Sequence, residues 1–129
     1  MITSIHHIAI IVSCERSLDF YKVLGFTEKF RKKREFDTVV LMNGYGIEIE
    51  FFIDQRHPVR GVGVDEPIGL RHFALQTSDK LENEIEKLQN SSLCILKVGP
   101  IMIDWTGVRF CFLYDLDGTI VELREITVT

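Results

Sequence analysis

Short apolar runs alternate with polar turns along the chain, and two stretches have helical rather than strand spacing. Apolar residues three or four positions apart predict helices over about 14–24 and 79–89. Runs rich in β-branched and aromatic residues predict strands between them. The predicted strands cover residues 5–12, 26–34, 36–42, 47–53, 70–77, 93–98, 108–114 and 120–126. The order is therefore βαβββ, followed by the same order again.

Two polar segments divide this pattern. The turn Asn43-Gly44-Tyr45-Gly46 contains Asn-Gly, a strong hairpin signal. Residues 54–68 hold two prolines and two glycines, which predicts a loop that connects two halves. We therefore expect a single α+β domain over 1–129, with modules at about 1–53 and 69–129. Two βαβββ modules would form one curved eight-stranded mixed sheet with the helices outside.

The two halves also share residues at matching places. His7-Ile8-Ala9 and His72-Phe73-Ala74 each stand in the first strand of a half, and the two histidines are 65 positions apart (72 − 7). Glu48 and Glu122 each stand in the last strand of a half, 74 positions apart (122 − 48). Such internal repetition indicates a duplicated architecture in which each half contributes the same residue types.

These repeated residues are candidates for metal binding. A lone histidine on a strand is more often a satisfied or exposed side chain, but a carboxylate that interrupts an apolar strand is costly unless it is paired or binds a metal. Two imidazoles and two carboxylates make a plausible ligand set for a divalent ion. Alternation places His6 on the face opposite His7, whereas Glu48 and Glu50 share a face and alternation cannot separate them.

Bulk composition narrows the possible functions. The chain has 129 residues, a net charge of −4 and a pI of about 5.5, which disfavours a nucleic-acid surface. No apolar stretch approaches the length of a membrane span, and no leader-like segment begins the chain. Three cysteines occur without a CxxC pair. We expect a cytoplasmic protein with a small-molecule substrate, and neither a nucleic acid nor a membrane as partner.

Three motifs resemble a known superfamily, in matching order along nearly the whole chain. The first resembles the opening of the superfamily and reads Ile5-His6-His7-Ile8-Ala9-Ile10. The second resembles the opening of its second half and reads Gly69-Leu70-Arg71-His72-Phe73-Ala74. The third resembles its closing motif and reads Asp115-Leu116-Asp117-Gly118-Thr119-Ile120-Val121-Glu122-Leu123. The superfamily is the vicinal-oxygen-chelate group of glyoxalases, bleomycin resistance proteins and extradiol dioxygenases. The chain is most similar to the small glyoxalase I-like proteins of bacteria.

The resemblance implies a site and a reaction. One divalent ion (Ni, Co or Zn) would be bound by His7, Glu48, His72 and Glu122. Glu122 would be the general base, with Glu48 as the next candidate. The implied activity is that of a lactoylglutathione lyase-like enzyme, which converts the hemithioacetal of a 2-oxoaldehyde and a thiol into a 2-hydroxyacyl thioester through an enediolate. The implied assembly is a homodimer.

Alternatives remain at this point. His6 could replace His7 as a ligand, and Glu50 could replace Glu48. The protein could instead be another metal-dependent enzyme of the superfamily, such as an epimerase, a dioxygenase or a thiol transferase. It could also be a non-catalytic protein that binds a small molecule.

Overall fold

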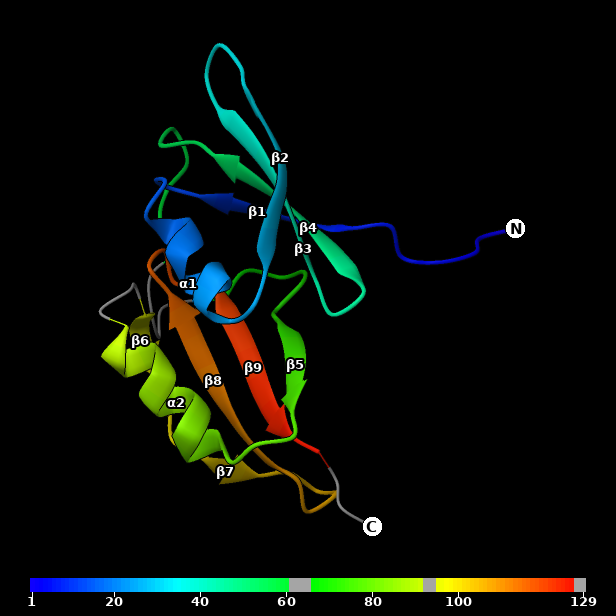
Figure 1. The fold of residues 1–129 in the computed structure, drawn as a ribbon, viewed down its shortest axis with the longest axis vertical. Coiled ribbons are helices and arrows are strands. Elements are labelled where there is room, and N and C mark those ends of the chain that lie inside the picture. The colour runs from blue at the N-terminus through cyan, green and yellow to red at the C-terminus, as the bar shows by residue number, and fades with distance from the viewer. Residues whose placement is uncertain (61–65, 92–94, 127–129) are drawn as a thin grey trace. The chain divides into compact units, whose positions relative to one another are not determined.

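The fold comes from a computed structural model that describes residues 1–60, 66–91 and 95–126. The chain divides into two compact units, Met1–Pro58 and Val59–Thr129 (Figure 1). The boundary falls within the predicted connecting loop, of which residues 61–65 lie outside the described part. The first residues of the predicted strand 93–98 lie outside it as well.

Unit 1 is a four-stranded mixed sheet with one helix. Its strands lie in the order β1-β4-β3-β2, where β1 runs parallel to β4 and the other two pairings are antiparallel. The outer strands are thus β1 and β2. The elements in chain order are β1 (Ile8–Val12), α1 (Ser17–Val23), β2 (Thr27–Lys33), β3 (Thr38–Gly44) and β4 (Ile47–Ile53).

The core of unit 1 lies between the sheet and α1. Ile49 and Phe51 of β4 are fully buried, whereas Glu48 and Glu50, which alternate with them, are only partly buried. The Phe51 ring lies 4.6 Å from the ring of Tyr21 on α1. Strand alternation therefore turns the apolar side chains of β4 towards the helix and its carboxylates towards the other face.

Glycine ends α1 and turns the chain into β2. Gly25 has a φ of 109°, and its N–H donates to the Lys22 carbonyl while the Phe26 N–H donates to the Tyr21 carbonyl. This pair of hydrogen bonds is the Schellman motif, which satisfies carbonyl groups at the end of a helix. Phe26 is buried just after the turn, so the helix end also directs an apolar side chain into the core.

A two-residue turn sets the register of β3 and β4. Tyr45 and Gly46 form it, with φ values of 55° and 78°, as a type I′ hairpin requires. The hairpin predicted at Asn43-Gly44 is thus present, but its corner lies two residues later than the Asn-Gly signal. Gly44 still pairs with Ile47, which fixes the partners of all later residues in β4.

Unit 2 repeats this plan with one addition. Its sheet has the order β5-β9-β8-β6, with β5 parallel to β9 and the other pairings antiparallel. A two-residue strand, β7, pairs with β8 and was not predicted from the sequence. The elements in chain order are β5 (Phe73–Thr77), α2 (Leu81–Asn90), β6 (Ile95–Val98), β7 (Met102–Ile103), β8 (Arg109–Asp115) and β9 (Ile120–Glu125).

Helix α2 packs against β6, β8 and β9 through Leu81 and Leu88, both of which are buried. The turn from β8 into β9 is held by a buried carboxylate. Asp115 Oδ1 accepts the N–H groups of Asp117 at 2.9 Å and Thr119 at 2.8 Å. Because a buried carboxylate is costly without such donors, this turn has little freedom to change the register of β9.

The α+β class and the two βαβββ modules are confirmed. In hydrogen bonding the strands form two sheets, one in each unit. Both first strands begin later than predicted, at Ile8 and Phe73, so that His7 and His72 each stand directly before a strand. Within the described residues, no helix is both long and apolar enough to span a membrane.

Phe51 and Phe52 make a matched pair for testing the core of unit 1. Phe51→Ala should lower the free energy of unfolding by about 3–5 kcal/mol, because it leaves a cavity beside Tyr21. Phe52→Ala should cost clearly less, since Phe52 is only partly buried on the other face. Urea unfolding followed by circular dichroism measures both. Equal losses would contradict the assignment of Phe51 to the core.

Candidate metal centre

The first histidine–carboxylate pair lies in unit 1. His7 stands directly before β1, and its Nε2 is 3.9 Å from Oε1 of Glu50 on β4. Both side chains are partly exposed, at 38% for His7 and 28% for Glu50. The pair lies on the sheet face opposite α1, because Glu50 alternates with the buried Ile49 and Phe51.

The second pair lies in unit 2 and is closer and more buried. His72 stands directly before β5, and its Nε2 is 3.4 Å from Oε1 of Glu122 on β9. The His72 side chain is 23% exposed and that of Glu122 is 11% exposed. The His72 ring also lies against Phe112, at 5.2 Å between ring centroids.

Strand pairing shows which carboxylates are equivalent. Ala9, two residues after His7, pairs with Glu50 in the parallel β1–β4 ladder. Ala74, two residues after His72, pairs with Glu122 in the parallel β5–β9 ladder. From the repeat in the sequence we predicted that Glu48 corresponds to Glu122, but the strand register makes Glu50 the equivalent of Glu122.

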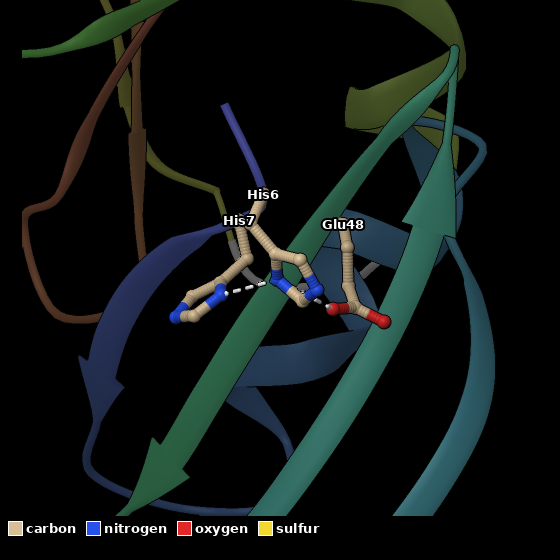
Figure 2. A group of neighbouring side chains, drawn as sticks. All are labelled: His6, His7 and Glu48. Carbon is tan, nitrogen blue, oxygen red and sulfur yellow. Dashed lines mark hydrogen bonds and ion pairs between the residues drawn. The ribbon is translucent and has the colours of Figure 1, made fainter. Parts of the chain in front are cut away.

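Glu48 has different neighbours. It accepts a hydrogen bond from Lys29 Nζ at 3.2 Å. Its Oε2 is also 3.9 Å from Nδ1 of His6, as Figure 2 shows. His6 in turn contacts His7, with 2.9 Å between their Nδ1 atoms. One ligand atom each from His6, His7 and Glu48 lies within 4.8 Å of the others, so this trio is a second possible ligand group.

His6 was expected on the face opposite His7. The structure instead brings the two rings into edge contact, because both residues precede β1 and strand alternation does not govern them. The His6 side chain is 85% exposed. It borders an open hollow of about 670 Å³ in unit 1 that Lys29, Tyr45 and Glu48 also line.

Arg71 contacts the other ring nitrogen of His72. Its Nη1 lies 3.2 Å from His72 Nδ1, its guanidinium lies over the Phe112 ring, and its Nε donates to Glu66 at 2.8 Å. An arginine can only donate, so this contact makes Nδ1 the acceptor and places the ring hydrogen on Nε2, towards Glu122. A metal ligand at Nε2 needs the other tautomer, and metal binding would therefore displace this contact.

Arg124 and Asp104 complete the surroundings of Glu122, and sequence reasoning assigned neither a role. Arg124 Nη1 donates to Glu122 Oε2 at 3.2 Å, and its Nη2 donates to Asp104 Oδ2 at 2.5 Å. Hydrogen bonds from Thr106 and Arg124 hold the pKa of Asp104 well below its usual range. The signal for Arg124 was its place two residues after Glu122 on the same strand face. Asp104 lies in a loop and had no such signal.

The chemistry of both pairs fits a divalent ion. Metal–ligand bonds of about 2.0–2.2 Å set imidazole nitrogen and carboxylate oxygen about 3.0–3.4 Å apart in ordinary coordination angles. The His72–Glu122 pair is within this range at 3.4 Å, and the His7–Glu50 pair at 3.9 Å is slightly open. Each unit could thus offer one nitrogen and one oxygen to such an ion.

Similarity to known proteins extends along nearly the whole chain. The family model described as the glyoxalase/bleomycin resistance protein/dioxygenase superfamily matches residues 4–123. A glyoxalase family protein from Enterococcus faecalis is 31% identical, with a TM-score of 0.80, and the match covers 95% of this chain and 97% of that one. No curated protein matches the chain.

Two more distant structures share the fold. The fosfomycin resistance protein FosX from Listeria monocytogenes, in a complex with Mn(II) and sulfate, is 18% identical with a TM-score of 0.71, over 99% of this chain and 96% of that one. Lactoylglutathione lyase from Agrobacterium tumefaciens is 16% identical with a TM-score of 0.65, over 97% and 95%. With the family model spanning nearly all of its residues, the chain belongs to the glyoxalase/bleomycin resistance protein/dioxygenase superfamily.

Proposed function

We propose that this protein is a metal-dependent enzyme whose divalent ion is bound by His7, Glu50, His72 and Glu122. The observation that carries the proposal is the repeated pair: in each unit a histidine before the first strand lies beside a carboxylate of the last strand, at the same register. The Mn(II) complex of FosX supports a divalent ion in this fold.

The proposed reaction is a glyoxalase-type isomerisation of a hemithioacetal. A proton leaves the carbon that bears the thiol group and returns to the neighbouring carbon, while the hydroxyl proton passes to the other oxygen, so no atom is gained or lost. When bound, the divalent ion would act as a Lewis acid that stabilises the negative charge on the substrate oxygens. Glu122 would accept the carbon-bound proton, and its carboxylate is the more buried of the two.

The metal and the assembly are part of the proposal. Ni(II) or Co(II) suits a site with two nitrogen and two oxygen ligands and two open positions, and Zn(II) is the common competitor. The fold similarity to FosX adds Mn(II) to the ions worth testing. We expect a homodimer, which sedimentation of the metal-loaded protein would measure.

The histidines separate the two possible ligand groups. His7→Ala and His72→Ala should each abolish tight metal binding, because each removes one of only two nitrogen ligands. His6→Ala should retain most of it, since His6 contacts His7 rather than Glu50. Titration of the apo-protein with Co(II), followed by its absorption, measures all three. Loss of binding in His6→Ala with retention in His72→Ala would favour the His6, His7 and Glu48 group instead.

The two carboxylates of β4 provide a matched pair of variants. Glu50→Gln should weaken metal binding strongly, because it removes the charged oxygen ligand nearest His7. Glu48→Gln should have a small effect, since Glu48 is paired with Lys29. The same Co(II) titration compares them under identical conditions. The reverse order would return the ligand role to Glu48 and show that strand register does not select the ligand.

Glu122→Gln tests the base and the activity together. It keeps the shape and one oxygen of Glu122 but loses its charge and basicity. At saturating metal we expect turnover of a methylglyoxal hemithioacetal to fall on the order of 10²–10⁴-fold, the usual contribution of a general base. Metal binding should weaken moderately. Saturation must be verified by titration, because incomplete occupancy would imitate the loss of a base.

Two outcomes would contradict the proposal in different ways. Turnover in Glu122→Gln within about threefold of the unmodified protein, far inside the range of a general base, would assign that role elsewhere, with Glu50 the next candidate. Absence of turnover with Ni(II), Co(II), Zn(II) and Mn(II) would reject the glyoxalase reaction and leave the metal site. Fosfomycin consumption by the same loaded protein would then point to the reaction of FosX.

A further inference from the structure

A continuous set of hydrogen bonds links Glu122 to a loop that follows β7. Arg124 donates with one nitrogen to Glu122 Oε2 at 3.2 Å and with the other to Asp104 Oδ2 at 2.5 Å. The Asp104 side chain is only 6% exposed and that of Arg124 is 29% exposed. The guanidinium also lies 6.0 Å from the centre of the Phe110 ring. Arg124 is therefore held by two carboxylates and an aromatic face.

Asp104 is itself fixed by its own turn. Its Oδ1 accepts hydrogen bonds from the Thr106 N–H at 2.8 Å, the Thr106 hydroxyl at 2.5 Å and the Val108 N–H at 3.1 Å. The Asp104 N–H donates to the Val108 carbonyl at 3.0 Å, which closes the turn between β7 and β8. One carboxylate oxygen is thus committed to the turn, and the other remains for Arg124.

The two carboxylate oxygens of Glu122 have different partners. Oε2 accepts from Arg124, whereas Oε1 is the oxygen beside His72 Nε2. A charged hydrogen bond to one oxygen restricts rotation of the carboxylate and favours one-oxygen coordination through the other. Without a counter-charge, the positive guanidinium of Arg124 would repel a metal ion bound at Glu122. The Asp104 carboxylate supplies that counter-charge.

The position of unit 1 that is equivalent to Arg124 carries no hydrogen-bond donor in its side chain. Strand register matches Phe52 with Arg124, because Ile11 pairs with Phe52 as Gln76 pairs with Arg124. A phenylalanine donates no hydrogen bond. The Arg34 guanidinium lies over the Phe52 ring and acts on Glu50 through its charge, but among the described residues no arginine donates a hydrogen bond to Glu50. The repeat supplies two equivalent carboxylates, and within the part of the chain that the structure describes only Glu122 accepts a hydrogen bond from an arginine.

We propose that Arg124 is a positioning residue, anchored by Asp104, that holds one oxygen of Glu122 and presents the other to the metal and the substrate proton. The inference rests on the proposed function and deepens it, because it explains why Glu122 rather than Glu50 acts as the base. Arg124 itself touches neither metal nor substrate in this role; it acts through Glu122.

Three variants and one control test the role of Arg124. Arg124→Met removes the charge and the donors at similar size, Arg124→Lys keeps the charge, and Asp104→Asn keeps Arg124 but removes the balancing charge. Arg109→Met is the control, because Arg109 forms ion pairs with Glu82 and Glu125 rather than Glu122. For each protein, Co(II) affinity, the Co(II) absorption spectrum, thermal midpoint and kcat at saturating metal are measured.

The expected change in Co(II) affinity has opposite signs for Arg124→Met and Asp104→Asn. Arg124→Met should lower kcat by about 10²-fold, the usual effect of a misplaced catalytic group, while Co(II) binding stays equal or tightens because a positive charge is lost. Its Co(II) spectrum should change as Glu122 becomes free to bind with both oxygens. Asp104→Asn should weaken Co(II) binding, because the guanidinium charge is no longer balanced. Arg124→Lys should restore part of kcat, and Arg109→Met should resemble the unmodified protein.

A merely structural role would look different. It would lower the thermal midpoint, Co(II) affinity and kcat together in both Arg124→Met and Asp104→Asn, and that result would overturn the inference. A kcat within about threefold of the unmodified protein in Arg124→Met would overturn it as well, being far smaller than the effect of misplacement. If the unmodified protein neither binds metal nor turns over substrate, the proposed function fails first and this inference falls with it.

Discussion

Parallel pairing between the first and last strand of each unit is the interaction on which the candidate site depends. In both units a histidine stands directly before the first strand, and the residue two positions after it pairs with a glutamate of the last strand. This pairing brings the histidine and the glutamate side by side. Adjacent strands lie about 4.8 Å apart, so side chains on one face of such a pair are within reach of a shared ion. The helix packs on the opposite face and leaves the pair accessible.

Turns outside the ladders secure that pairing. In unit 1 the Tyr45-Gly46 corner sets the register of β3 and β4, and thereby the place of Glu50. In unit 2 the buried Asp115 closes the turn into β9 and thereby sets the place of Glu122. A shift by one residue would move each carboxylate to the helix side of its sheet, where burial without a partner is costly. The turns therefore keep Glu50 and Glu122 on the open face of each sheet, although no turn residue is among the proposed ligands.

The two carboxylates are equivalent in position but not in environment. Glu122 is more buried than Glu50 and shares an arginine with Asp104, whereas Phe52 occupies the equivalent place beside Glu50. A duplicated fold can thus give two equivalent carboxylates different roles. One carboxylate can serve mainly as a ligand, and the other can be oriented for proton transfer as well.

Much of this could be predicted from the sequence, because periodicity and repeated residues are local properties. Runs of β-branched and aromatic residues predicted the strands, and alternation within them predicted that Glu48 and Glu50 share a face. The matching positions of His7 and His72 predicted that each half repeats the same plan. The period of two could not choose between Glu48 and Glu50, which lie on the same face. Which of the two lies beside His7 depends on which backbone groups pair across β1 and β4, and pairing is decided by turns and packing. Likewise, Asp104 meets Arg124 only because the β7–β8 turn folds back on β9, a contact between segments twenty residues apart that no local pattern encodes.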